Sequence, residues 1–145
     1  MANRRTFLKS SAAAGAAVAA TGAGVFAAGG DETIKVGLVG CGGRGTGAVR
    51  DILNAEARIN GKNPKVEIVA VGDVFKSQAQ NAVRAFKSTN PKSNYSKFTA
   101  QMKMTPETTF DGLDAYQKVL NAGVDLVILA TPPGFRPIHL EAAIK

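Results

Sequence analysis

The chain has 145 residues, a length that suits one globular domain and not two. Hydrophobic residues make up 45% of it and charged residues 20%, proportions typical of a folded protein, so the composition gives no sign of disorder. The formal net charge is +7, of which Arg4, Arg5 and Lys9 supply +3. The remaining +4 is a modest excess that does not by itself indicate a nucleic-acid partner.

Cysteine and histidine occur once each, as Cys41 and His139. A single cysteine excludes an intrachain disulfide, and with it the class of small secreted proteins held together by disulfides. One cysteine and one histidine cannot build a zinc site of the usual kind, so we predict no metal site.

The N-terminal segment has a basic head and a weakly apolar body. Arg4-Arg5 is followed by Phe7-Leu8 and Lys9, an order that resembles the twin-arginine export motif. Residues 10–30 carry no charge and are mostly Ala and Gly, which contribute too little transfer free energy for a stable membrane anchor. We predict that residues 1–28 are a twin-arginine signal peptide, so the protein would be exported to the periplasm by the twin-arginine machinery. A membrane anchor and a disordered tail are the alternatives.

Strand and helix patterns alternate in the next part of the chain. Residues 34–39 are β-branched and apolar, and they predict a strand. The following helix carries four apolar residues on one face: Ala48, Val49, Ile52 and Leu53. After the polar stretch 58–64, residues 66–71 predict a second strand that ends at Gly72-Asp73. A second helix has apolar residues at i, i+3, i+4 and i+7: Ala79, Ala82, Val83 and Phe86.

Residues 88–108 are rich in Ser, Thr, Asn and Lys and contain two prolines, so we predict a long loop with a short strand near Phe110. Within residues 74–106 there are six basic side chains and no acidic one: Lys76, Arg84, Lys87, Lys92, Lys97 and Lys103. An anionic polymer is one possible ligand for such a stretch. The aromatic residues there show no regular stacking pattern, so we favour a solvated insertion and no nucleic-acid partner.

The last part of the chain predicts a helix, a strand and another helix. Asp111 is expected to cap a helix with Gly123 at its end and four apolar residues on one face: Leu113, Tyr116, Val119 and Leu120. Residues 124–131 are a nearly continuous apolar run, which fits a strand buried on both faces of a parallel sheet. A final helix starts near Phe135. The alternation predicts an α/β fold with a doubly wound parallel sheet of the Rossmann type.

A glycine-rich loop lies between the first strand and the first helix. Its sequence is Gly40-Cys41-Gly42-Gly43-Arg44-Gly45, which matches the pattern G-x-G-x-x-G. In such loops Gly40 permits the tight turn, Gly42 lets the backbone approach a pyrophosphate, and Gly45 lets the helix pack close to the sheet. Because the N–H groups at the helix start would face the phosphates, the loop, including Gly43 and Arg44, predicts a dinucleotide-binding site.

Asp73 ends the second strand, where a carboxylate can accept hydrogen bonds from ribose hydroxyls. It lies 28 residues beyond Gly45, more than the usual spacing of about 20, and the polar stretch 58–64 is expected to account for the excess. The alternative is that Asp73 only caps the next helix. A carboxylate here repels a 2′-phosphate, so NAD is the predicted cofactor, and nearby Lys76 keeps NADP possible.

Three segments, residues 34–45, 71–75 and 125–133, together resemble the Gfo/Idh/MocA family of oxidoreductases, and the resemblance spans about residues 33 to 145. That family oxidises or reduces sugars, inositols and related polyols with NAD(P). Its turn after the fourth strand lies beside the nicotinamide half of the cofactor, so the resemblance implies that Thr131, Pro132 and Pro133 contact the cofactor. A proline terminator between a strand and a helix is the alternative interpretation.

Members of that family continue into a fifth strand, a Glu-Lys-Pro motif with a catalytic lysine, and a second domain that binds the substrate. We therefore expect residues 33–145 to be an NAD(P)-binding domain that is incomplete at its C-terminus, with no catalytic residue of its own. A sugar or polyol substrate is expected only for a full-length relative. A non-catalytic nucleotide-binding module and an unstable product without activity are the alternatives.

Three further residues are expected to have structural and not catalytic roles. His139 has no carboxylate nearby in the sequence and is not expected to act in catalysis. Cys41 is expected to be a small turn residue and not a reactive thiol. Asp125 opens the fourth strand and is expected to be structural.

Overall fold

The structure, a computed structural model, describes residues 33–61 and 63–145, so the predicted signal peptide at residues 1–28 lies outside it. The described strands are β1 (Ile34–Val39), β2 (Val66–Asp73), β3 (Thr109–Asp111) and β4 (Leu126–Leu129). The helices that alternate with them are α2 (Gly43–Asn60), α3 (Lys76–Phe86), α4 (Ala115–Leu120) and α5 (Arg136–Ile144). None of the helices in this part of the chain has the length and apolar character needed to cross a membrane.

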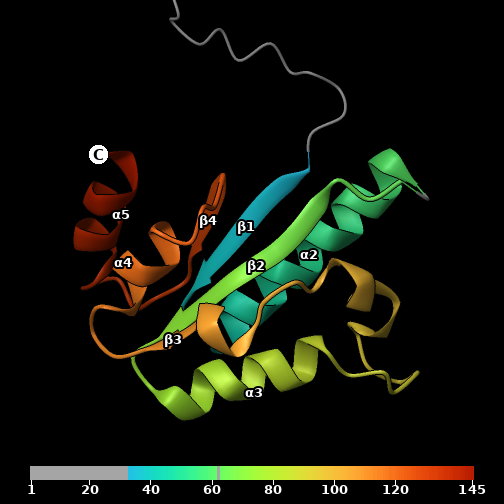
Figure 1. The fold of residues 1–145 in the computed structure, drawn as a ribbon, viewed down its shortest axis with the longest axis horizontal. Coiled ribbons are helices and arrows are strands. Elements are labelled where there is room, and N and C mark those ends of the chain that lie inside the picture. Colours follow the sequence, from blue (N-terminus) through green and yellow to red (C-terminus); the bar gives the residue numbers. More distant parts are fainter. Residues whose placement is uncertain (1–32, 62) are drawn as a thin grey trace, which may run out of the picture. The chain divides into compact units, whose positions relative to one another are not determined.

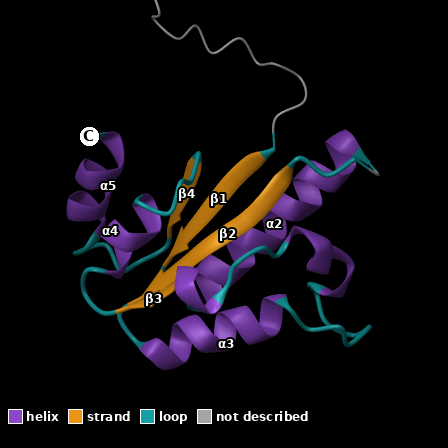
Figure 2. Cartoon of the chain, in the orientation of Figure 1, coloured by secondary structure: helices purple, strands orange, loops and turns teal. Residues whose placement is uncertain are grey.

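The strands form one parallel sheet in the order β3-β2-β1-β4 (Figure 1). Helices α2 and α3 pack on one face of the sheet, while α4 packs on the other and α5 lies beside α4 and β4 (Figure 2). A parallel sheet covered on both faces confirms the predicted α/β class and is consistent with a Rossmann-like fold.

Alternation along β1 divides its side chains between two hydrophobic clusters. Val36 and Leu38 belong to the larger cluster, together with Val49 and Leu53 of α2, and Val39 belongs to the cluster on the opposite face. Val49 and Leu53 are four residues apart, so one stripe of α2 faces the sheet. Each of these fully buried side chains stabilises the fold by about 1.5–3 kcal/mol relative to exposure.

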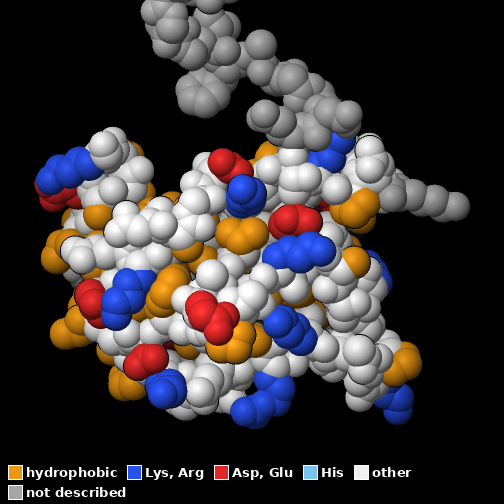
Figure 3. Space-filling view, in the orientation of Figure 1, with side chains coloured by type: hydrophobic (Ala, Val, Ile, Leu, Met, Phe, Trp, Pro, Cys, Tyr) orange, Lys and Arg blue, Asp and Glu red, His pale blue; other side chains and the backbone are white. Residues whose placement is uncertain are grey.

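The segment 88–108 contributes to the core, which the sequence did not predict. It contains two 3-10 helices, η1 (Ser96–Gln101) and η2 (Pro106–Thr108), and it buries Phe98, Met102 and Met104. The prediction of a solvated surface is correct for its basic side chains, which are exposed (Figure 3). It is wrong for these three apolar residues, because their spacings change from four residues to two and so do not continue a single helix or strand period.

Helix α4 starts later than predicted. Asp111 is the last residue of β3, Asp114 is at the N-cap position, and Leu113 is 70% exposed between them. Gly112 has a φ of +102°, a value that favours glycine and turns the chain out of β3 before the helix can begin. The prediction that Asp111 caps this helix is therefore wrong, although the short strand near Phe110 is confirmed.

Strand β4 is shorter and more exposed than predicted. Only Leu126–Leu129 are in strand conformation, and each of them is at least partly exposed. Among the described residues β4 pairs with β1 alone, so it lies at an edge of the sheet. The predicted burial on both faces is therefore not observed. Helix α2 extends into the polar stretch 58–64 as far as Asn60 and ends at Gly61.

Candidate functional site

The carboxyl ends of β1, β2 and β4 meet at one edge of the sheet. The chain leaves β1 through α2 on one face and reaches β4 through α4 on the other, so the connections diverge between β1 and β4. Parallel sheets characteristically bind ligands in the crevice at such a point. Here a cavity of about 520 Å³ opens, and it is lined by Gly40, Gly42, Gly43, Arg44, Asp73, Thr131 and Pro132 among others. All the predicted contacts except Gly45 and Pro133 line this cavity.

Two glycines of the loop are required by close packing within the fold. Gly40 has a φ of +96°, and a Cβ there would lie 2.8 Å from the carbonyl carbon of Ala130 and 2.9 Å from the backbone nitrogen of Thr131. A Cβ on Gly45 would lie 1.8 Å from the carbonyl oxygen of Gly40. The first glycine therefore brings the loop after β4 against β1, and the last brings α2 against the end of β1.

The two middle glycines face open space instead. No atom lies within 4 Å of the position that a Cβ would occupy on Gly42 or Gly43. Helix α2 begins here, with Gly42 at its N-cap, no side-chain cap and no acidic residue in its first turn. The start of an 18-residue helix therefore faces the cavity with the positive end of its dipole, an arrangement that favours an anion.

Asp73 is held by two backbone N–H groups. Its Oδ2 accepts a hydrogen bond from Cys41 N at 2.7 Å, and its Oδ1 accepts one from Phe75 N at 2.9 Å. The capping alternative is not realised, because Phe75 is the N-cap of α3 and Asp73 remains in β2. Each carboxylate oxygen has a second lone pair, so Asp73 can still accept hydrogen bonds from a ligand in the cavity.

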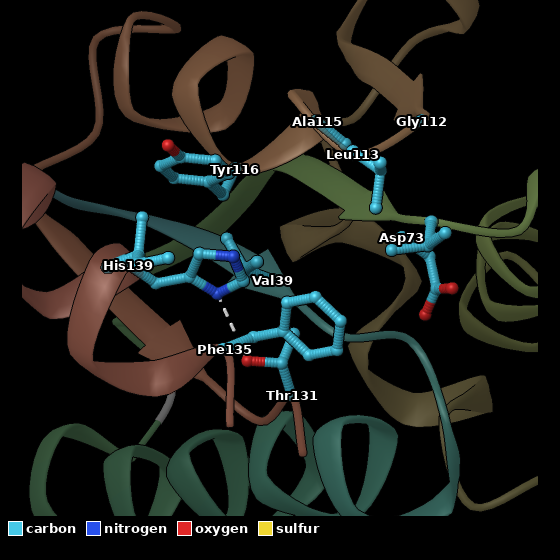
Figure 4. Close-up of a pocket in the computed structure, with 11 residues that line it drawn as sticks. Val39, Asp73, Gly112, Leu113, Ala115, Tyr116, Thr131, Phe135 and His139 are labelled. Atoms are coloured by element: carbon cyan, nitrogen blue, oxygen red, sulfur yellow. Dashed lines mark hydrogen bonds between the residues drawn. The ribbon is translucent and has the colours of Figure 1, made fainter. Parts of the chain in front are cut away.

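Thr131 is fixed from both sides by α5. Its Oγ1 lies 3.0 Å from Nδ1 of His139 (Figure 4). Its carbonyl oxygen accepts a hydrogen bond of 2.8 Å from Nε of Arg136. The His139 ring is stacked on Tyr116 of α4, with ring centroids 4.3 Å apart. The turn after β4 is therefore held by two hydrogen bonds with α5, one of them with a ring that also packs on α4.

Sequence reasoning missed His139, Phe135 and Arg136 as components of the site. His139 was not expected to act in catalysis because no carboxylate is near it in the sequence, but it lines the cavity, and its partner is a hydroxyl eight residues earlier. The signal that could have found it is the short turn between β4 and α5, which brings the first turns of the helix back to the end of the strand. Pro133, by contrast, is outside the cavity lining.

A second cavity, of about 230 Å³, adjoins the first and shares Asp73, Thr131, Phe135 and His139 with it (Figure 4). It extends toward Tyr116 and Leu113, so its walls are mainly apolar and aromatic. Phe135 is 43% exposed and Leu113 70% exposed although both are large apolar side chains. The site thus combines a helix start whose dipole favours an anion with an adjoining compartment that is mainly apolar.

Neither Cys41 nor Asp125 adds reactive chemistry. Cys41 is buried, and burial together with the negative charge of Asp73 raises the pKa of its thiol to about 12. At neutral pH it is a neutral thiol, as expected for a small turn residue. Asp125 accepts a hydrogen bond of 2.8 Å from Lys35 N, which ties β4 to the start of β1.

His139 makes the stability of the protein dependent on pH. Burial lowers the pKa of its ring below the ordinary value of 6.5, so the unfolded chain binds the proton more readily than the folded one. The contribution of this ring to stability is therefore full well above pH 6.5 and is lost as the pH is lowered through 6.5 toward 5. We expect the melting temperature to fall more over this range in the wild type than in His139→Gln. Equal falls in both proteins would contradict this assignment.

Comparisons with protein-family models, with curated proteins and with solved structures found no match to this chain. The described residues contain no group of three His, Cys, Asp or Glu side chains that could hold a metal ion. The chemistry of the site therefore has to be argued from its own geometry.

Proposed function

We propose that this chain binds a nicotinamide dinucleotide at the crevice between the ends of β1, β2 and β4. One observation carries the proposal: the glycine loop, Asp73 and the Thr131-Pro132 turn line a single cavity where the connections of the sheet diverge. The cavity of about 520 Å³ falls within the 300–1,000 Å³ that is usual for small-molecule sites.

The residues of the site fit such a cofactor. The space in front of Gly42 and Gly43 would admit a pyrophosphate against the backbone, and the start of α2 would stabilise its charge. Asp73 would accept hydrogen bonds from ribose hydroxyls with its free lone pairs. Thr131 and Pro132 would contact the cofactor from the opposite wall. When bound, the nicotinamide supplies hydride-transfer chemistry.

We further propose that the chain serves as the nucleotide-binding part of an oxidoreductase resembling the Gfo/Idh/MocA family. The fold, the position of the glycine loop and the Thr131-Pro132 turn support this. The substrate would then be a sugar or polyol bound with the help of a further domain. A second candidate is a nucleotide-binding module without turnover. It is favoured by one observation: the two titratable side chains that face each other across the lining are already engaged within the fold, His139 with Thr131 and Asp73 with the N–H groups of Cys41 and Phe75.

Titration of the protein with NADH, followed by fluorescence and by melting temperature together, tests the proposed binding. We expect micromolar affinity and a rise in melting temperature. Asp73→Ala should weaken NADH binding about tenfold or more, since it removes the ribose acceptor and releases the N–H of Cys41. Asp111→Asn is the matched control, because Asp111 ends the neighbouring strand and does not line the cavity.

The outcomes of this titration are distinct. A folded protein that ignores both NADH and NADPH would refute the proposed function. Tighter binding of NADPH than of NADH would show that Lys76 outweighs the carboxylate of Asp73, contrary to the predicted preference for NAD. Turnover of a polyol in the presence of NAD would exclude the second candidate function, a nucleotide-binding module without catalytic activity.

We also propose export by the twin-arginine route, on the basis of Arg4 and Arg5 and the uncharged stretch that follows them. This route carries folded proteins, which suits a protein that acquires a nucleotide in the cytoplasm. In a bacterial host, the wild-type chain is expected in the periplasmic fraction, and the variant with Arg4→Lys and Arg5→Lys in the cytoplasm. Equal periplasmic amounts of both would contradict the proposal.

A further inference from the structure

A second groove lies on the molecule, away from the candidate site. It runs between α3 and the segment formed by η2 and β3, and its volume is about 580 Å³. None of its lining residues lines the two cavities described above. It therefore requires an explanation of its own.

Three cations and an apolar floor characterise this groove. Lys76, Arg84 and Lys87 line it from α3, and all three are exposed. Within the described residues none of the three forms an ion pair, and Figure 3 shows basic side chains along the edge of the molecule that α3 forms. Between them lie the apolar side chains of Ala79 and Val83. Arg84 donates a hydrogen bond to the neutral Oδ1 of Asn81, so all three charges still lack an ion-pair partner and can attract an anionic ligand.

The spacing of the cations indicates the kind of partner. At a rise of about 1.5 Å per residue, Lys76 and Arg84 are about 12 Å apart along the helix, and Lys76 and Lys87 about 16 Å. A single small anion is too short to bridge them. An extended peptide advances about 3.3 Å per residue, so about five residues span the whole row.

The chemistry of the other lining residues favours a peptide over a nucleic acid. No aromatic side chain lines the groove, so bases would have no stacking platform. Asp111 lines the groove and would repel any phosphate beside it, which a nucleic acid cannot avoid because every unit is charged, whereas a peptide can place its uncharged residue there. A peptide can place acidic residues opposite the cations and an apolar residue on the floor at Ala79 and Val83.

We infer that this groove is a docking site for an acidic segment of a partner protein, one with glutamates or aspartates on both sides of an apolar residue. The inference does not depend on nucleotide binding, because the two sites share no lining residue. The groove and the proposed cofactor site can therefore be tested separately on the same chain.

The test uses a fluorescent pentapeptide, Glu-Glu-Leu-Glu-Glu, titrated at low salt and followed by polarisation. Arg84→Glu and Lys87→Glu should each weaken its binding about five- to tenfold, since each reversal replaces an attraction with a repulsion. Lys92→Glu is the matched control, because Lys92 is equally exposed but lies outside the groove. The control variant should bind the pentapeptide with wild-type affinity. All three variants should bind NADH with wild-type affinity.

Several results would overturn the inference. No measurable binding of the pentapeptide would show that the groove does not dock an acidic segment. An equal loss of affinity in Lys92→Glu would show that the peptide responds only to the net charge of the protein. Equal binding of Gln-Gln-Leu-Gln-Gln would exclude recognition of acidic side chains. Tighter, groove-dependent binding of a single-stranded oligonucleotide would assign the groove to nucleic acid instead. Unchanged melting temperatures are required for each comparison, and Arg84→Gln and Lys87→Gln replace any variant that fails to fold.

Discussion

Replacing Gly45 with alanine is expected to lower the free energy of unfolding by about 3 kcal/mol. The new Cβ would lie 1.8 Å from the carbonyl oxygen of Gly40 and 3.0 Å from Cδ1 of Leu38. The oxygen belongs to the backbone of the tight turn after β1, so it cannot move aside as a flexible side chain can. Relief would require α2 to separate from the sheet, and this would loosen the packing of Val49 and Leu53.

Gly47→Ala provides the matched control for this change. Gly47 lies in the same helix two residues later, and no atom lies within 4 Å of its Cβ position. Because alanine has a higher helix propensity than glycine, this variant should gain about 0.5–1 kcal/mol. Urea denaturation followed by circular dichroism would measure both changes. Gly45→Ala with wild-type stability would contradict the close approach of α2 to the end of β1.

Replacing Gly42 with valine is expected to leave the fold intact and to weaken NADH binding about 100-fold, which corresponds to about 2.7 kcal/mol. Gly42 has φ −70° and ψ −177°, a conformation that valine readily adopts, and its Cβ position is free of neighbours. The side chain would therefore fill the space in front of the start of α2. A pyrophosphate could then no longer approach the backbone there.

Measuring both the melting temperature and the NADH affinity distinguishes a blocked site from an unfolded protein. Gly134→Val is the control, because Gly134 also has no atom within 4 Å of its Cβ position but does not line the cavity. Both variants should melt near the wild-type temperature, and only Gly42→Val should lose NADH binding. If Gly42→Val bound NADH as the wild type does, the cofactor would not lie against the glycine loop.

Local patterns were sufficient to predict much of the fold. Strand β1 was predicted with its observed bounds, Ile34–Val39, because a short β-branched run followed by glycine has few other solutions. The prediction that the apolar residues of α2 share one face was correct, because the helix period alone determines which side chains lie on the same side. The meeting of the glycine loop with Asp73 in one cavity was also foreseeable, since the carboxyl ends of neighbouring parallel strands share an edge.

Contacts between distant parts of the chain were not foreseeable. Phe98 and Met104 are buried because the segment after α3 folds back over the sheet, and their spacing carries no periodic signal. The apolar run at β4 predicted a doubly buried strand, but exposure depends on which strands lie alongside, and β4 has only β1 beside it among the described residues.

The sequence by itself determined the order of strands and helices, the glycine loop and the acidic residue after β2, because each depends on residues close together in the chain. Only the tertiary structure decided that Asp73 accepts the N–H of Cys41 and that His139 holds Thr131 against the cavity. The first bond joins groups 32 residues apart that meet only when the sheet forms, and the second joins groups eight residues apart whose approach depends on how α5 packs against β4. Their geometry is therefore a property of the packed fold and not of any local pattern.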